Sequence, residues 1–157
     1  MSSRIGASVV SGLMAGVVFG MMMQMMSAPT PDGGQMSMMA MVGQIVGSPT
    51  VGVGWLYHLF NSAVIGAIFG WLLGNRVHGY ASGLGWGAAY GFAWWILGAL
   101  ILMPILLGMP AFAPLMMPPM RMVAMGSRMG HLIFGLILGA LFAWLYRGVH
   151  LQAPARA

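Results

Sequence analysis

The chain contains two similar halves, arranged one after the other. Residues 11–20 (SGLMAGVVFG) match residues 82–91 (SGLGWGAAYG) at an offset of 71 positions. The segment HLFNSAVIGAIFGWL, which begins at His58, matches HLIFGLILGALFAWL, which begins at His131, at an offset of 73. We therefore expect one domain over residues 1–157, made of repeat one (4–78) and repeat two (79–150).

The composition determines the solvent in which these halves fold. Hydrophobic residues make up 60% of the chain and charged residues 4%, with six arginines and a single acid, Asp32. Seven charged residues cannot cover the surface of a water-soluble domain of this size. We therefore expect most of the chain to contact lipid. The arginines are scattered singly, which is typical of topology signals and argues against a nucleic-acid partner.

Four stretches are long enough to cross a bilayer, which takes about 20 apolar residues. The predicted transmembrane helices cover 4–26, 53–74, 80–103 and 126–147. The first is similar to a secretory signal sequence, but it matches the third helix, so we expect it to be retained. The predicted fold is all-α: an integral membrane four-helix bundle of two tandem parallel two-helix repeats, related by a pseudo-two-fold axis along the membrane normal.

The arginines also predict the orientation. Four lie on one predicted side and two on the other: Arg4, Arg76, Arg147 and Arg156 against Arg121 and Arg128. By the positive-inside rule, both termini are cytoplasmic. The linkers 27–52 and 108–126 then lie outside. We expect a multi-pass protein of the cytoplasmic (inner) membrane of a bacterium or archaeon.

Small residues recur every four positions in each predicted helix, as in Gly12, Gly16 and Gly20. Such ladders let helix backbones approach closely in lipid. His58 and His131 each lie four residues before a ladder, near the outer end of its helix. Ionisable groups at this depth are costly and usually functional. We expect both imidazoles to point into a shared outer cavity.

Methionine is the second unusual feature. Of 19 methionines, nine lie between Met21 and Met41 and eight between Met103 and Met129, at the predicted outer face. Thioethers are soft ligands that suit Cu(I), and imidazole complements them. The candidate metal ligands are His58, His131, Met21, Met22, Met25, Met125 and Met129. In the alternative, methionine only fills space, and residues 35–47 form an amphipathic surface helix whose methionines face lipid.

Catalysis lacks the usual side chains. The chain has no cysteine, and its only carboxylate side chain, Asp32, lies in the turn-forming segment APTPDGGQ. No carboxylate pair exists, and no Ser-His-Asp set can form within a membrane site. The glycines lie inside the predicted spans rather than in a phosphate-binding loop. We expect a protein that is not an enzyme.

Three functions remain open. The protein binds or relays Cu(I) at its outer face; it is a non-catalytic accessory or assembly subunit of a larger, respiratory-type membrane complex or a homo-oligomer; or paired histidines bind haem b. The two His-led glycine segments resemble the second and fourth helices of uncharacterised small four-helix prokaryotic membrane proteins. This resemblance implies a fold and a membrane location but no activity.

Overall fold

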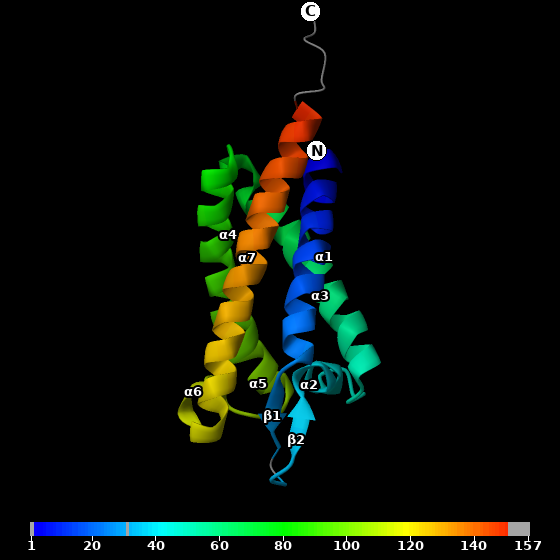
Figure 1. Cartoon of the computed structure of the whole chain (residues 1–157), viewed down its shortest axis with the longest axis vertical. Helices are drawn as coiled ribbons and strands as arrows, with labels where there is room; N and C mark the ends of the chain where they lie inside the picture. The colour runs from blue at the N-terminus through cyan, green and yellow to red at the C-terminus, as the bar shows by residue number, and fades with distance from the viewer. Residues whose placement is uncertain (1, 31, 151–157) are drawn as a thin grey trace, which may run out of the picture.

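Four long helices lie side by side and account for most of the chain (Figure 1). They are α1 (Ser2–Gln24), α3 (Val51–Leu73), α4 (Tyr80–Trp94) with its continuation η2 (Trp95–Leu102), and α7 (Arg121–His150). The computed structural model describes residues 2–30 and 32–150, and only the backbone of 2, 3 and 147–150. The expectation of an all-α protein is confirmed. Arg156 and the side chain of Arg147, two of the predicted topology signals, lie outside the described part.

Each of the four helices is long and apolar enough to span a membrane. The candidate spans are Arg4–Gln24, Val51–Arg76, Tyr80–Leu106 and Pro118–Tyr146. The first two agree with the predicted ranges to within about two residues at each end, whereas α7 begins at Arg121 rather than at 126. Proline is favoured in the first turn of a helix, and Pro118 begins the short helix η3 (Pro118–Met120) that leads into α7.

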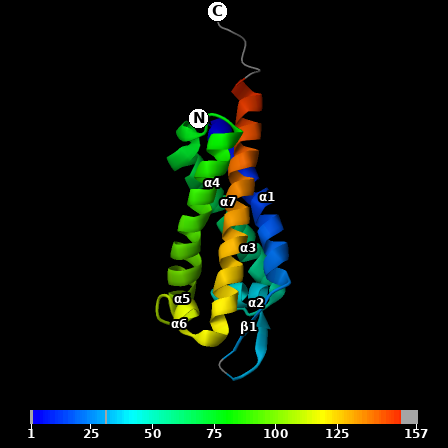
Figure 2. The same cartoon turned by 60° about the vertical axis from the view of Figure 1, so that its left-hand side comes forward.

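The two long connections lie at the same end of the bundle, which we call the connection end (Figures 1 and 2). The first contains the antiparallel strands β1 (Ser27–Pro29) and β2 (Gln35–Ser37), followed by α2 (Met38–Gln44). The second contains α5 (Met103–Leu106), α6 (Ala113–Met116) and η3. The start of α1 and the short helix η1 (Gly74–Arg76) lie at the opposite, terminal end (Figure 1).

The long helices form two close pairs, α1 with α3 and α4 with α7, and the pairs join where α1 packs against α7. Glycine makes both close pairs possible. A Cβ atom on Gly12 would stand 2.5 Å from the carbonyl oxygen of Ser62, and one on Gly83 would stand 2.5 Å from that of Gly139. The backbones are therefore in contact at these positions, as the small-residue ladders predict.

Aromatic side chains fill the centre of the terminal half. Phe69 of α3 and Phe142 of α7 are fully buried, with ring centroids 5.6 Å apart. Tyr90 of α4 packs edge-on against Phe69, and its hydroxyl donates to the carbonyl oxygen of Ile65 at 2.7 Å. In this half of the bundle, α4 therefore reaches α3 through a side chain.

The third long helix changes its winding in the other half. The segment η2 is a π-helix, and the candidate span continues to Leu106, three residues beyond the predicted end at 103. Pro104 has no N–H to donate to the carbonyl of Leu100, four residues earlier, and that carbonyl accepts from the N–H of Phe112 at 2.6 Å. Proline thus favours the wider winding in place of a regular α-helix.

The segment α2 packs inward. Met38, Met39 and Met41 are 6%, 0% and 7% exposed, and α2 lies against α3. A Cβ atom on Gly54 of α3 would overlap the carbonyl of Met39, so the two backbones touch. The alternative in which these methionines face lipid from a surface helix is therefore wrong for Met39. The helix α2 therefore covers the interior of the bundle at the connection end.

Candidate functional site

A cavity of about 300 Å³ lies between α3 and η2 in the connection half of the molecule. We call it the histidine cavity, because His58 and His131 both line it. Its position follows from uneven packing. Within the part of the chain that the structure describes, α3 makes no contact with α4 or η2 comparable to the contact between α1 and α7.

His58 is buried, and a backbone carbonyl fixes its tautomer. Its Nε2 lies 2.8 Å from the carbonyl oxygen of Gly16 on α1. A carbonyl oxygen only accepts hydrogen bonds, so Nε2 is the protonated nitrogen and Nδ1 has the lone pair. The edge of the ring also packs against Trp55, at 6.1 Å between centroids.

His131 has the opposite tautomer. Its Nδ1 donates to the carbonyl oxygen of Ser127, one turn earlier in α7, at 2.8 Å, and the Ser127 hydroxyl lies 3.3 Å from the same nitrogen. The lone pair is therefore on Nε2. Gly98 of η2 lies near Nε2, since a Cβ atom on this glycine would stand 3.9 Å from it. The lack of a side chain at Gly98 leaves space beside the imidazole.

Phe19 of α1 contacts both imidazoles. Its ring packs edge-on against His58 at 5.7 Å and against His131 at 4.8 Å between centroids. The ring lies against the backbone of Gly130, where a Cβ atom would overlap it. The two histidines thus share one cavity, and an aromatic ring touches both.

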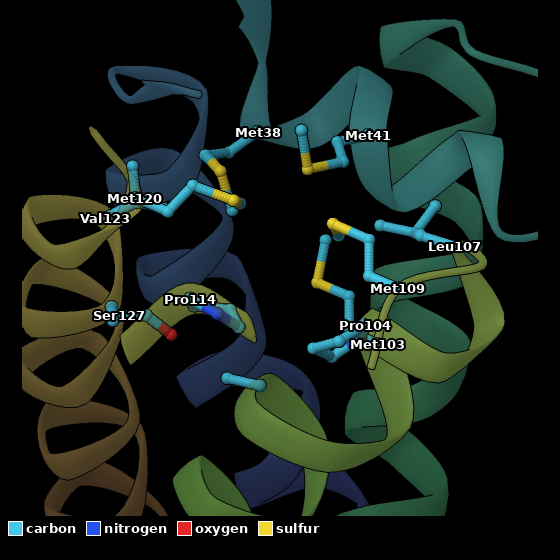
Figure 3. A pocket seen from close by; sticks show the side chains of 12 residues that line it. Met38, Met41, Met103, Pro104, Leu107, Met109, Pro114, Met120, Val123 and Ser127 are labelled. Atoms are coloured by element: carbon cyan, nitrogen blue, oxygen red, sulfur yellow. The ribbon is translucent and has the colours of Figure 1, made fainter. Parts of the chain in front are cut away.

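A second, smaller cavity of about 30 Å³ lies beside the first at the connection end. We call it the thioether cavity, because five methionines line it. Their side chains extend into the same space, with the sulfur atoms towards its interior (Figure 3). They come from α2, from α5 and the loop after it, and from η3: Met38, Met41, Met103, Met109 and Met120.

The two cavities are neighbours with a common wall. Met38, Ala99, Met103 and Ser127 line both of them. Since Ser127 is also the hydrogen-bond partner of His131, the polar side of the histidine cavity reaches the edge of the thioether cavity. The connection end therefore brings thioethers and imidazoles into one continuous region.

The methionines proposed from the sequence lie elsewhere. Met21, Met25, Met125 and Met129 are exposed on the outside of α1, the following turn and α7, and Met22 is half-buried against the core. None of these five lines either cavity. Instead, the structure brings together five other methionines of the same two sequence clusters, together with the predicted His58 and His131.

Oxygen and nitrogen ligands are scarce. Among residues 2–30 and 32–150, no group of three His, Cys, Asp or Glu side chains lies close enough to hold a metal ion. Asp32 is exposed between β1 and β2, and a hydrogen bond from the Thr30 side chain lowers the pKa of its carboxyl group. A metal ion bound in this part of the chain would therefore depend on thioethers.

Comparison with known proteins gives no relative: no family model, no curated protein and no solved structure matches the chain. The site itself is the basis for a functional proposal.

Proposed function

We propose that this chain is an integral membrane protein that binds Cu(I) in the thioether cavity and relays it to the histidine cavity. The observation on which the proposal depends is the convergence of five thioethers, from separate segments of both connections, on a space of about 30 Å³. A space of this size holds only one or a few water-sized groups, which suits a single ion with its ligands.

The chemistry of the lining selects the kind of ion. Thioethers are neutral, soft ligands that favour Cu(I) over hard cations such as Mg²⁺ and Ca²⁺. A monovalent ion in an apolar surrounding needs several ligands at once, because burying an unpaired charge is costly. Five flexible methionine side chains supply such a set without adding further charge.

The neighbouring imidazoles supply the next ligands. His131 and His58 each keep one nitrogen with a lone pair, because backbone carbonyls occupy the other. A Cu(I) ion that leaves Met103, which lines both cavities, meets these nitrogens in the histidine cavity. In this proposal the connection end faces away from the cytoplasm and the bundle spans the membrane with both termini inside.

The proposal includes two equivalent halves. Support comes from Gly12 and Gly83, 71 residues apart, because a Cβ atom on either would stand 2.5 Å from a backbone carbonyl oxygen of the partner helix. These carbonyls belong to Ser62 and Gly139, which differ by one turn from an exact repeat of the contact. Phe69 and Phe142, 73 residues apart, meet each other in the core. Such a self-contact is expected where a pseudo-two-fold axis passes between two repeats.

The two other functions have less support. Haem ligation by both histidines needs a flat macrocycle between the imidazoles, but the ring of Phe19 contacts both of them. An accessory role would use exposed apolar faces, such as those with Leu56 and Phe60. In a membrane protein lipid also covers such faces, so they do not favour a partner.

The test is a Cu(I) competition titration of the purified protein against a chromophoric chelator. We expect the double variant Met103→Leu/Met120→Leu to bind Cu(I) at least tenfold more weakly, because leucine keeps the apolar volume but removes the sulfur. The matched control is Met21→Leu/Met129→Leu, at two positions that are each 56% exposed. The control variant is expected to bind like the unmodified protein.

Two results would contradict the proposal. One is equal affinity in the cavity variant and the unmodified protein; the other is an equal loss in both double variants, which would indicate nonspecific thioether binding. The relay step is tested separately with His58→Ala/His131→Ala, for which we expect much weaker high-affinity binding. Unchanged stoichiometry and affinity would remove the histidines from the proposal.

A further inference from the structure

The histidine cavity is much larger than a metal ion requires. Its volume of about 300 Å³ is ten times that of the thioether cavity and lies at the lower end of the range for small-molecule sites. Aromatic side chains form much of its wall: Phe19, Tyr57, Trp94 and Phe134. A wall of this kind suits a flat ring.

The cavity opens towards the outside of the bundle. Three of its apolar lining residues, Val64 on α3, Leu102 on η2 and Leu106 on α5, are 42%, 42% and 56% exposed. They mark a mouth on the flank of the bundle, between α3 and η2, that extends to α5. If the bundle spans a membrane, this mouth faces the hydrocarbon of the bilayer, so the ligand enters from lipid.

Two polar groups inside the cavity have unused hydrogen-bonding capacity. The amide of Asn61 on α3 makes no hydrogen bond among the residues that the structure describes, and the Nε2 lone pair of His131 on α7 makes none either. A saturated acyl chain in the cavity would leave both unsatisfied, which is costly in an apolar surrounding. A ligand with oxygen atoms on its ring would satisfy both.

The tautomer of His131 specifies the ligand further. Because Nδ1 donates to Ser127, Nε2 accepts, so the ligand must donate at that point. A hydroxyl group on the ring does so, whereas a carbonyl does not. Gly98 leaves the space beside Nε2 that such a ring needs, and it lies on the π-helix, a deformation often found at functional sites.

We propose that the histidine cavity binds a membrane-soluble quinol: a hydroxylated ring held between Asn61 and His131, with its hydrocarbon tail leaving between α3 and η2. This inference concerns binding alone. It shares the lone pair of His131 with the Cu(I) relay step, but it does not require Cu(I) to bind in the thioether cavity. His58 remains held by Gly16 and contributes to the wall of the cavity.

The experiment measures binding of decylubiquinol, in its reduced form, to the purified protein in nanodiscs through quenching of tryptophan fluorescence, to which Trp94 in the cavity wall contributes. The blocking variant is Gly98→Leu. Its Cβ atom would meet only Trp94 and His131 at 3.8 and 3.9 Å, so the side chain enters the cavity without a backbone clash. We expect saturable quenching by decylubiquinol to be lost.

The matched control is Gly85→Leu, on the same long helix, where a Cβ atom meets nothing within 4 Å. It is expected to bind decylubiquinol like the unmodified protein. Asn61→Leu, which keeps the size but removes the amide, is expected to weaken binding about fivefold to tenfold, as for the loss of one hydrogen bond. The oxidised form, decylubiquinone, is expected to bind more weakly than the quinol.

Three results would overturn the inference: binding unchanged in Gly98→Leu, equal affinity for quinol and quinone, or equal competition by decane, which would make the cavity a lipid site. The Cu(I) titration of Gly98→Leu separates the two proposals. Loss of quinol binding with intact Cu(I) binding supports the quinol site whatever the outcome of the methionine variants.

Discussion

The two helix pairs, α1 with α3 and α4 with α7, use matching glycines on α1 and α4 but differ where the cavities form. Gly12 and Gly83 each bring a partner backbone carbonyl close, that of Ser62 and that of Gly139, and these two partners differ by one turn from an exact repeat. One turn further on, Gly16 faces the side chain of Ser62, whereas Gly87 faces the bare backbone of Gly135. The histidines bond in different ways too: His58 across to α1, and His131 back to its own helix. The backbone contacts therefore fix how the helices pack within each pair. The positions at which the two pairs differ shape the histidine cavity.

The largest effect is expected at the shared contact. Gly12→Ala and Gly83→Ala each place a methyl group 2.5 Å from a backbone carbonyl oxygen that cannot move away cheaply. We expect each to destabilise the protein by about 1–3 kcal/mol, and by similar amounts if the pairs are equivalent. Thermal unfolding of the purified protein in detergent measures both.

Gly85→Ala is the control for this comparison, because a Cβ atom there meets nothing within 4 Å. In a helix, alanine in open space is favoured over glycine by up to about 1 kcal/mol. The control is therefore expected to leave stability unchanged or to raise it. A large loss in only one of Gly12→Ala and Gly83→Ala would break the equivalence of the two pairs.

A smaller effect is expected from the contact that differs. A Cβ atom on Gly16 would stand 2.6 Å from the Cβ atom of Ser62, so Gly16→Ala clashes with a side chain and not with the backbone. Ser62→Gly removes that side chain and makes α3 like α7 at the matching position. We expect Ser62→Gly to recover about 1 kcal/mol of the loss caused by Gly16→Ala, measured as the coupling in a double-mutant cycle.

The matching double-mutant cycle in α4 and α7 offers no substitution that would relieve the clash. Gly87→Ala would overlap the carbonyl oxygen of Gly135, where no side chain exists to remove. Additive effects of Gly16→Ala and Ser62→Gly would contradict the geometry described for α1 and α3.

Much of the scaffold could be predicted from the sequence, because apolar length and small-residue spacing are local properties. These properties are almost sufficient to predict the four long apolar helices, the grouping of the two long connections and the shared cavity of His58 and His131. The choice of methionines was different. Met23 is 8% exposed and Met25 is 89% exposed, although both belong to the run MMMQMM. Where nearly every residue is apolar, hydrophobic periodicity does not distinguish the inner face of a helix from its outer face.

The two cavities had no local signal at all. They depend on the π-helix before Pro104, on α2 folding inward against Gly54, and on the gap between α3 and η2. Each of these features depends on contacts between segments that are far apart in the sequence. Proline clusters in the second connection indicate where helices end but not which methionines the turns bring together.

The smallest effect is expected at the side-chain bridge between the pairs. Tyr90 lies at the position that matches Phe19, 71 residues earlier, and its hydroxyl donates to Ile65 across the gap between α4 and α3. Tyr90→Phe makes α4 like α1 here and removes one hydrogen bond, for which about 0.6 kcal/mol is typical between membrane helices. Tyr80→Phe, at a residue that is 49% exposed, is the control and is expected to be neutral in the same unfolding measurement. A loss of several kcal/mol in Tyr90→Phe would instead mean that this bridge, and not the α1–α7 contact, holds the two pairs together.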